Sequence, residues 1–420
     1  MTSWRRWIVA CVAAGLVLRL IFGLVYWVGK PLTHDEREYL ALGRSVARGE
    51  GFVYPADEPS PGTAQQFGRA PGYPAFLALL RVSEPVEAVP ARVKAAQAVV
   101  GAVGVWLIAV LAGRAAGPRA AVIAAAVAAV YPPLVFMTAY ALSETLYSAV
   151  ALAAAWVLGD SRLFQQRISK LGKVTLEKVT VPFAGVLTGL AILIRPAMLL
   201  FVPLAVAWLW RKNRSDAAIF LAVTLACVAP WTIRNAHIYG RVILVASEGG
   251  VTFWTGNHPL ARGDGDLAAN LPLKQAELDF RNQHAGLTPE QLEPLYYRDA
   301  LTWIRAHPLA WAALLVRKVF FTIVPIGPSY TLHSTRYFAA SAGSYLALLL
   351  PAIAGAWVLW RCGHPPVALW LMAASTVIAG LIFFPQERFR IPVVDPALIV
   401  SAAGLAALGG HERTRRRTDV

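Results

Sequence analysis

The stretch "WIVACVAAGLVLRLIFGLVYWV", residues 7–28, decides the class of fold. It is apolar apart from Arg19, and about 20 such residues are enough for a helix to cross the hydrocarbon core of a bilayer. The stretch is longer than the apolar region of a secretory signal, and no small-residue cleavage site follows it before Lys30. We therefore interpret it as an uncleaved membrane anchor.

The rest of the chain has the same character. Of its 420 residues, 57% are hydrophobic and 15% are charged, and the mean hydropathy is +0.52. This is more apolar surface than one water-soluble core buries, so we predict an all-α polytopic membrane protein. The net charge of +15 has no basic patch interleaved with exposed aromatic residues, so we expect no nucleic-acid partner.

Apolar runs of about 20 residues predict about ten crossings. They are 7–28, 92–112, 118–134, 141–159, 181–194, 196–210, 217–235, 341–359, 366–384 and 391–409. The connectors rich in Lys and Arg are the N-terminus, 114–119, 160–178, 211–214, Arg361 and the tail 411–417. By the positive-inside rule these connectors are cytoplasmic, which places both termini inside a bacterial cytoplasmic membrane.

One apolar segment, residues 309–328, does not fit an even number of crossings. As a span it would hold Arg317 and Lys318 near mid-bilayer, where each charge costs about 3 kcal/mol. An eleventh crossing would also place the arginine-rich tail outside. We expect a re-entrant or interfacial helix here.

The predicted organisation has three parts. They are a transmembrane catalytic module at 1–235 with a first outer loop at 30–91, a periplasmic loop or lid at 236–308, and a C-terminal transmembrane module at 309–420. Within the lid we predict a helix with Thr288 as its cap, Gln291 completing a capping box, and a stop at His307-Pro308.

Two adjacent acids, Asp35 and Glu36, begin a polar segment directly after the first span. A structural interpretation is available, because Thr33 can cap a helix in which Glu36 takes the third position, and acids suit the first turn. A functional interpretation is that these carboxylates do chemistry at the membrane surface. The local sequence leaves both open.

Other charged residues collect on the same predicted side of the membrane. They are Arg69, Glu144, Arg195, Arg388 and Arg390. Acids and arginines at one membrane surface, rather than at the midplane, suit a reaction on a lipid headgroup better than a transport pathway.

The order of several motifs resembles a known family. The motifs are "HDEREYLALGRSVARGEGF" (34–52), "GRAPGYPAFLALL" (68–80), "ALSETLYSAV" (141–150), "ILIRP" (192–196), "PWTIRNAHIYGRVILVASEGGVTFWTGNHP" (230–259) and "ERFRIPVVDPALIV" (387–400). Together they resemble the bacterial GT-C fold membrane glycosyltransferases related to the protein mannosyltransferases and the aminoarabinose transferase, the glycosyltransferase family 39-like group.

The resemblance implies an inverting hexosyl- or pentosyltransferase that moves a sugar from a polyprenyl-phosphate carrier to a glycan, lipid or protein acceptor outside the membrane. It places the acidic pair at Asp35 and Glu36, with Asp35 as the base, and a further catalytic acid at Glu144. Glu144 is equally well explained as a helix-start acid.

The resemblance also implies a substrate-binding set. Arg69 is the candidate for the carrier phosphate, with Tyr73 of the following turn beside it, although the aminoarabinose enzymes have a lysine-containing pattern there. Further candidates are Arg195, Trp254, Arg388 and Arg390. Arginines at span ends also snorkel to headgroups, and interface aromatics are common, so each has a structural alternative.

We predict no obligatory metal or other cofactor, because no histidine spacing indicates a metal site. Two other functions stay open. A transporter or flippase of lipid-linked sugars would need charged or broken-helix sites at the midplane, and a polysaccharide polymerase or ligase would use a diphosphate-linked donor and give Asp35 no role.

Overall fold

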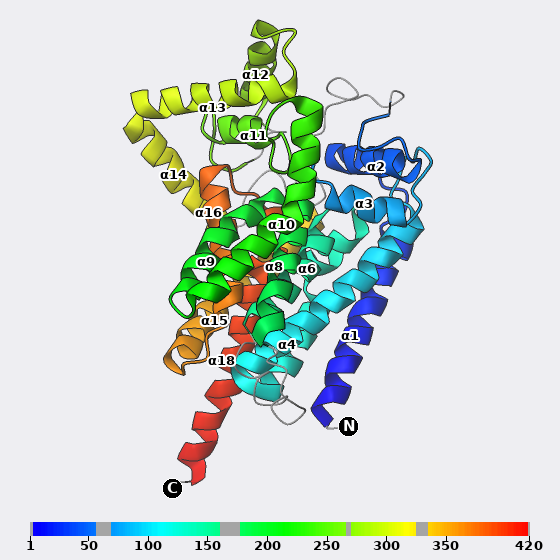
Figure 1. The fold of residues 1–420 in the computed structure, drawn as a ribbon. Coiled ribbons are helices and arrows are strands. Elements are labelled where there is room, and N and C mark those ends of the chain that lie inside the picture. The colour runs from blue at the N-terminus through cyan, green and yellow to red at the C-terminus, as the bar shows by residue number, and fades with distance from the viewer. Residues whose placement is uncertain (1–2, 56–68, 160–176, 266–269, 325–334, 419–420) are drawn as a thin grey trace.

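The computed structural model describes residues 3–55, 69–159, 177–265, 270–324 and 335–418, all of them helical or irregular, with no strand in those ranges (Figure 1). The basic connector predicted at 160–178, except for its last two residues, lies outside the described residues. So do residues 329–334 of the loop before the span at 341–359.

The elements follow one another along the chain with mostly short connections. They are α1 (Ser3–Ile21), η1 (Phe22–Tyr26), α2 (His34–Ala47), α3 (Gly72–Leu79), α4 (Ala91–Val130), α5 (Pro132–Phe136), η2 (Met137–Ala139), α6 (Glu144–Leu158), α8 (Glu177–Ile194), η3 (Pro196–Leu200), α9 (Phe201–Trp210), α10 (Arg214–Tyr239), α11 (Gly249–Gly256), α12 (Leu271–Gln283), α13 (Pro289–Ala306), α14 (Pro308–Ile323), α15 (Thr335–Arg361), α16 (Val367–Ile382), α17 (Glu387–Arg390) and α18 (Val394–Thr418).

Four described helical segments are long and apolar enough to cross a bilayer. They are Ser3–Tyr26, Ala91–Val130, Arg214–Tyr239 and Thr335–Arg361. Shorter apolar helices are Glu144–Leu158, Thr180–Ile194, Pro196–Trp210, Val367–Ile382 and Val394–Leu408. The all-helical membrane class is confirmed, whereas the expected number of ten to eleven crossings stays a prediction.

The bundle is held together by small residues. α1 packs on α4, α18 packs on both α4 and α15, and α8 packs on α10. Alanines of α4 fill the core, and helices in lipid approach closely where such small residues meet. At the α15–α18 contact, a Cβ on Gly355 would lie 1.9 Å from the carbonyl oxygen of Ser401, so only glycine fits.

α4 contains a sharp break that divides it into two helical arms. Ala116 and Gly117 leave the helical region, and Gly117 has a φ of 82°. Arg19 of α1 lies beside Gly101 of the first arm and bonds to Ala129 of the second, so the arms fold back on each other. The break falls between the spans predicted at 92–112 and 118–134.

Arg19 is buried inside the bundle, and its guanidinium closes the end of α4. It donates to the carbonyl oxygens of Ala128 at 3.1 Å and Ala129 at 3.0 Å, and to that of Gly15 in its own helix at 3.0 Å. The last carbonyls of a helix have no partner within the helix, and a cation there also suits the helix dipole. Arg19 therefore joins neighbouring helices.

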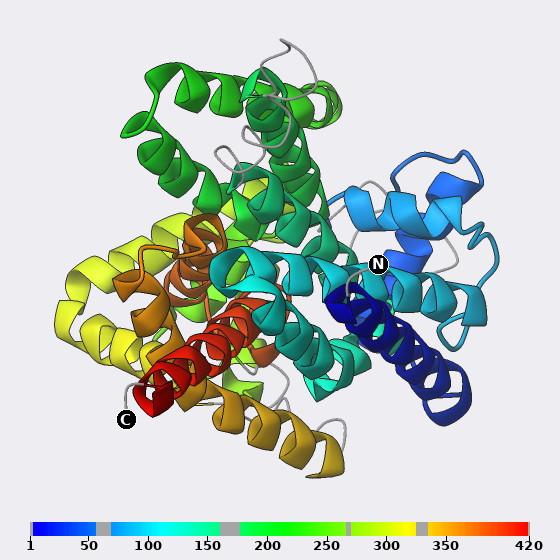
Figure 2. The same cartoon turned by 90° about the horizontal axis from the view of Figure 1, so that it is seen from below.

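The two ends of the bundle differ in what they carry. Both chain termini lie at one end, and α2, α3, α11, α12 and α13 lie at the other (Figure 1). The view from below shows the N-terminal helix and the C-terminal helix both reaching that shared end (Figure 2). We call the end with α2 and α11 the distal end.

The helix predicted with Thr288 as its cap is confirmed as α13, with a capping box between Thr288 and Gln291. It meets α14 at an angle of 108°, which is the geometry of a broken span or a re-entrant loop. Lys318 of α14 is buried and donates to Asn257 Oδ1 at 3.1 Å and to the carbonyl oxygen of Leu381 at 3.0 Å. Its charge therefore meets polar partners inside the protein instead of lipid.

Candidate functional site

The site begins with the first turn of α2. The capping box between Thr33 and Glu36 fixes the start of this helix: Thr33 N donates to Glu36 Oε2 at 2.8 Å, and Glu36 N donates to Thr33 Oγ1 at 3.3 Å. Glu36 is buried, and its Oε1 accepts a bond from the backbone N–H of Ala141 at 2.9 Å. Glu36 therefore has a structural role: it caps α2 and joins this helix to the segment before α6.

Asp35, its neighbour, lies between two guanidinium groups. Arg69, just before α3, donates from Nη2 to Asp35 Oδ1 at 2.5 Å, and Arg388 of α17 donates from Nη1 to Oδ2. Burial alone would raise the pKa of Asp35, but the charges of Arg388 and Arg69 outweigh burial and hold that pKa well below its usual range. Asp35 is therefore a stable anion in this arrangement.

Arg69 is shared by three carboxylates. Besides Asp35, it donates from Nε to Glu38 Oε2 at 2.7 Å, and its Nε lies 3.5 Å from Glu248 Oε1. Its guanidinium also lies over the ring of Tyr39, 5.2 Å from the centroid. Burial would lower the pKa of Arg69, and the surrounding acids hold it well above its usual value.

Glu38 and Glu248 are site residues that the sequence interpretation missed. Glu38 was predictable from the sequence, because it follows Asp35 by three residues and therefore shares a face of the predicted helix with it. Glu248 precedes Gly249 at the start of α11 and had no such signal, since only the tertiary structure brings it to Arg69, which is far from it in the chain.

The cluster continues towards the bundle through Glu144. Its Oε1 lies 2.9 Å from Arg195 Nη1 and 4.0 Å from Arg388 Nε. Both arginines also flank the ring of Phe389, 4.7 and 5.3 Å from its centroid. Glu144 thus starts α6 and also faces two guanidinium groups, so its two interpretations are compatible.

We call these connected residues the arginine–carboxylate cluster. It consists of Asp35, Glu38, Arg69, Glu144, Arg195, Glu248 and Arg388. Its members come from α2, α6, α17, the segment before α3, the α8–η3 corner and the start of α11. Three guanidinium groups in one cluster form a site suited to an anionic group such as phosphate.

Three other predicted binding residues lie outside the cluster. Tyr73 is buried and donates its hydroxyl to Gln97 Oε1 at 3.0 Å. Trp254 donates Nε1 to Asp299 Oδ2 at 2.6 Å and packs in a hydrophobic cluster of α11, α12 and α13. Arg390 has its Nε 3.2 Å from Asp395 Oδ1 and its guanidinium over the ring of Tyr345.

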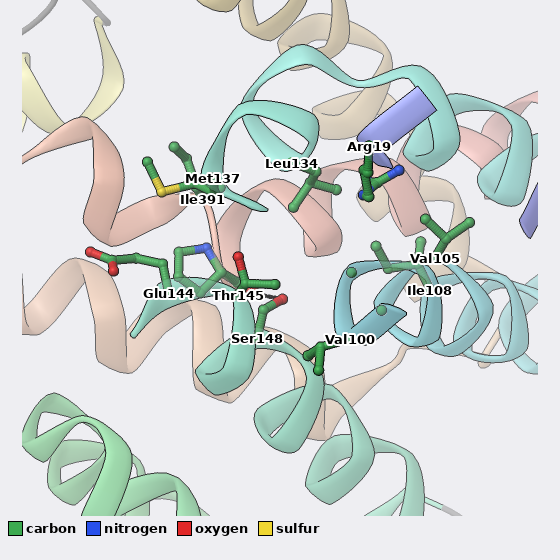
Figure 3. Close-up of a pocket in the computed structure, with 13 residues that line it drawn as sticks. Arg19, Val100, Val105, Ile108, Leu134, Met137, Glu144, Thr145, Ser148 and Ile391 are labelled. Carbon is green, nitrogen blue, oxygen red and sulfur yellow. Dashed lines mark hydrogen bonds between the residues drawn. The ribbon is translucent and has the colours of Figure 1, made fainter. Parts of the chain in front are cut away.

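A small cavity lies beside the cluster, within the bundle (Figure 3). Its volume is about 20 Å³, room for about one water molecule. Arg19, Thr145 and Ser148 line it, while the carboxylate of Glu144 turns away from the Arg19 side, as Figure 3 shows. The cavity is too small for a sugar.

A larger cavity, of about 600 Å³, lies along another face of α2. Arg37 and Arg44 of α2 line it together with Glu84 and Glu87. None of the residues of the arginine–carboxylate cluster is among its lining residues.

The remaining prediction for this site is that it needs no metal ion. Across the described ranges, no group of three or more His, Cys, Asp or Glu side chains is arranged to hold a metal ion. That no metal is obligatory stays a prediction.

The protein is similar in structure to several proteins of known structure. The sequence matches no protein-family model and no curated protein. The archaeal oligosaccharyltransferase of Archaeoglobus fulgidus, solved with an inhibitory peptide and a dolichol-phosphate, aligns with a TM-score of 0.54 at 14% identity over 100% of this chain and 52% of that one. An Archaeoglobus fulgidus oligosaccharyltransferase tethered with an acceptor peptide aligns with a TM-score of 0.57 at 14% identity over 96% and 49%.

A weaker likeness is to ArnT from Cupriavidus metallidurans bound to undecaprenyl phosphate. Its TM-score is 0.44 at 14% identity, over 95% of this chain and 76% of that one. The chain spans about half the length of the archaeal oligosaccharyltransferases, and the alignment with them covers nearly all of its own residues. The chain therefore has the fold of the GT-C membrane glycosyltransferases, which the resemblance of its motifs implied.

Proposed function

We propose that the protein is an integral-membrane inverting glycosyltransferase of the bacterial cytoplasmic membrane. It moves a hexosyl or pentosyl group from a polyprenyl-phosphate carrier to a lipid, glycan or protein acceptor on the periplasmic side, with both termini in the cytoplasm. The observation that carries the proposal is the position of Asp35 between Arg69 and Arg388 at the distal end of a GT-C bundle.

The chemistry fits this arrangement. In the reaction the bond between the anomeric carbon and the carrier phosphate breaks, and the phosphate leaves with the electron pair. A guanidinium group donates two parallel hydrogen bonds to two phosphate oxygens, and it stays charged at working pH. Arg69 and Arg388, with Arg195 nearby, therefore suit the leaving phosphate.

The acceptor attacks from the side opposite the phosphate. Its oxygen or nitrogen bonds to the anomeric carbon, and its proton passes to a carboxylate of the cluster. A single displacement inverts the anomeric centre and needs no second, nucleophilic carboxylate. A positioned base of this kind contributes about 10²- to 10⁴-fold to the rate.

The solved structures support a lipid-linked donor in this proposal. The archaeal oligosaccharyltransferase structure contains a dolichol-phosphate, and a phosphate on a polyprenyl chain is the group that we assign to the arginines here. We propose no obligatory metal or other cofactor. Membrane lipids and the acceptor are the other partners.

A transporter of lipid-linked sugars is the second candidate function. It shares the membrane class and the basic distal end, but its coupling sites are expected near the bilayer midplane. In the bundle interior Arg19 is held by three backbone carbonyls. This leaves the charged cluster at the distal end as the better-supported reaction site. A polymerase or ligase using a diphosphate-linked donor is the third, and it gives Asp35 no necessary role.

The test uses the full chain, purified and reconstituted in liposomes with a panel of polyprenyl-phosphate sugars and polyprenyl-diphosphate sugars. The proposal expects release of polyprenyl phosphate from at least one monophosphate donor and loss of most of that release in Asp35→Asn. Asp216→Asn, a half-buried acid in the first turn of α10 and outside the cluster, is the matched control and is expected to keep the unmodified rate.

Three results would contradict the proposal. Movement of a lipid-linked sugar between leaflets without turnover supports the transporter. Turnover of diphosphate donors alone supports the polymerase or ligase. Unchanged turnover in Asp35→Asn removes the cluster from the reaction.

A further inference from the structure

The carboxylates of the arginine–carboxylate cluster differ in how open they are. The exposed fraction of the side chain is 39% for Glu248, 18% for Asp35, 11% for Glu38 and 3% for Glu144. A base must come within hydrogen-bond reach of the proton that it removes. Glu248 is therefore the carboxylate of the cluster that an acceptor reaches most readily.

Asp35 is poorly placed for this task because both of its oxygens are engaged. Oδ1 accepts from Arg69 and Oδ2 accepts from Arg388. A carboxylate that two guanidinium groups stabilise as an anion is a weak base. Asp35 is instead placed to hold both guanidinium groups in one position.

Glu248 makes looser contacts. Its carboxylate lies 3.5 Å from Arg69 Nε, and among the described residues no side chain or backbone group donates a hydrogen bond to it. Its place is nevertheless fixed, because the two glycines that follow pack against α13. A Cβ on Gly249 would lie 2.5 Å from Tyr297 Oη, and one on Gly250 would lie 2.5 Å from the carbonyl oxygen of Glu293.

The acids of the cluster also contact different arginines. Arg388 and Arg195 lie towards the bundle, with Glu144 between them. Glu248 contacts Arg69 and stands directly before α11, which lies at the distal end of the molecule (Figure 1). A carrier phosphate towards Arg388 and Arg195 would leave Glu248 to the acceptor.

We propose that Glu248, and not Asp35, accepts the proton of the attacking acceptor group, and that Asp35 positions Arg69 and Arg388 for the carrier phosphate. This inference rests on the proposed glycosyltransferase function. In the step, the acceptor O–H or N–H bond breaks as the bond to the anomeric carbon forms. The proton goes to Glu248, and the electron pair of the broken carbon–oxygen bond leaves on the phosphate.

The charges around Glu248 suit a base that works near neutral pH. Partial withdrawal from water of this half-buried carboxylate raises the pKa of Glu248 to about 7; the charges of Arg69 and Arg388 oppose that rise, and the nearby Glu38 and Asp35 add to it. From α13, Glu293 and Tyr297 face the two glycines that follow. A base with a pKa near the operating pH is the most effective one.

The experiment is the pH dependence of kcat/KM for the acceptor, measured with a polyprenyl-phosphate donor that the full chain turns over. For the unmodified protein, kcat/KM is expected to fall about tenfold per pH unit below the Glu248 pKa, because the protonated carboxyl cannot accept a proton. Glu248→Gln is expected to lose this acid limb and about 10²-fold or more of kcat. Glu248→Asp is expected to keep the limb at a reduced rate.

A binding measurement separates the two roles. Glu248→Gln is expected to bind polyprenyl phosphate, used alone as the probe, as tightly as the unmodified protein, whereas Asp35→Asn is expected to bind it more weakly and to keep the acid limb in its residual activity. Asp279→Asn, an exposed acid on α12 of the same lid, is the isosteric control and is expected to change neither quantity.

Two outcomes overturn the assignment. One is an acid limb near pH 7 that survives in Glu248→Gln, and the other is a limb that disappears in Asp35→Asn with Glu248 intact. Either result leaves sugar transfer itself in place, so the glycosyltransferase function stands while the base assignment fails. If the unmodified protein turns over no polyprenyl-phosphate sugar, the function and the assignment fail together.

Discussion

Arg388 donates a hydrogen bond from its Nη1 to Oδ2 of Asp35, a residue 353 positions earlier in the chain. This contact joins two helices that are far apart in the chain. They are α17, which precedes the last helix α18, and α2, which follows the first helix α1. Arg69 completes the arrangement on the other oxygen of Asp35. Asp35 thereby holds both guanidinium groups side by side, in the place where we propose that the carrier phosphate binds.

Arg388→Gln is expected to weaken the binding of polyprenyl phosphate about 10- to 100-fold, since a hydrogen bond to a charged group contributes about 1.5–3 kcal/mol. The measurement is a titration of purified protein in detergent. Arg214→Gln, an exposed arginine at the other end of the bundle, is the control and should bind as before. Equal affinities for both variants would remove Arg388 from the phosphate site.

Asp35→Asn is expected to lower the free energy of unfolding by about 2 kcal/mol, less than for a fully buried ion pair because the pair with Arg388 is partly exposed. The pKa of Asp35 is lower in the folded protein, so its contribution is complete above the unfolded pKa of about 4 and is lost as the pH falls below that value.

The unfolding free energies of the unmodified protein and Asp35→Asn should therefore converge in acid below about pH 4. Unfolding followed in detergent from pH 3 to pH 8 measures this. A difference that grows on acidification would contradict the pairing. Asp216→Asn should track the unmodified protein across the range.

Glu36→Ala is expected to cost about 2 kcal/mol of stability, because it removes the capping box of α2 and leaves the buried N–H of Ala141 without its partner. The pH dependence of the residual activity should keep its acid limb, since Glu36 takes no proton in the proposed reaction. Thermal unfolding and the pH profile together check this. An abolished limb with unchanged stability would make Glu36 a catalytic group instead.

Arg390→Gln is expected to destabilise the protein by about 3 kcal/mol, because it leaves Asp395 buried with its ion pair broken. Polyprenyl phosphate should bind the folded variant with its normal affinity. Comparison with Arg388→Gln in the same titration makes the distinction, since the two arginines come from one motif. Weakened binding without loss of stability would return Arg390 to the substrate site.

Arg19→Met is expected to cost about 2–4 kcal/mol, because the carbonyls of Ala128 and Ala129 at the end of α4 lose their donor in the bundle interior. Arg5→Met, on an exposed position of the same helix, should leave the midpoint of thermal unfolding nearly unchanged. If both variants unfold alike, Arg19 does not hold the end of α4.

Local features of the fold were predictable from the sequence. The apolar runs mark membrane helices because a bilayer demands about 20 apolar residues per crossing. The starts of α2 and α13 follow from Thr33–Glu36 and Thr288–Gln291, pairs that lie within one helical turn. The order of the motifs implied the GT-C fold.

Tertiary structure decided which of the predicted residues meet. Arg388 and Arg390 stand two positions apart on α17, about 200° around the helix, so one reaches Asp35 and the other Asp395. Glu248 meets Arg69 only because the tertiary structure brings the start of α11 to the segment before α3. Helix capping and the length of an apolar run depend on residues that are neighbours along the chain, so both can be predicted from the sequence. The cluster depends on contacts between helices far apart in the chain, and no local pattern records those contacts.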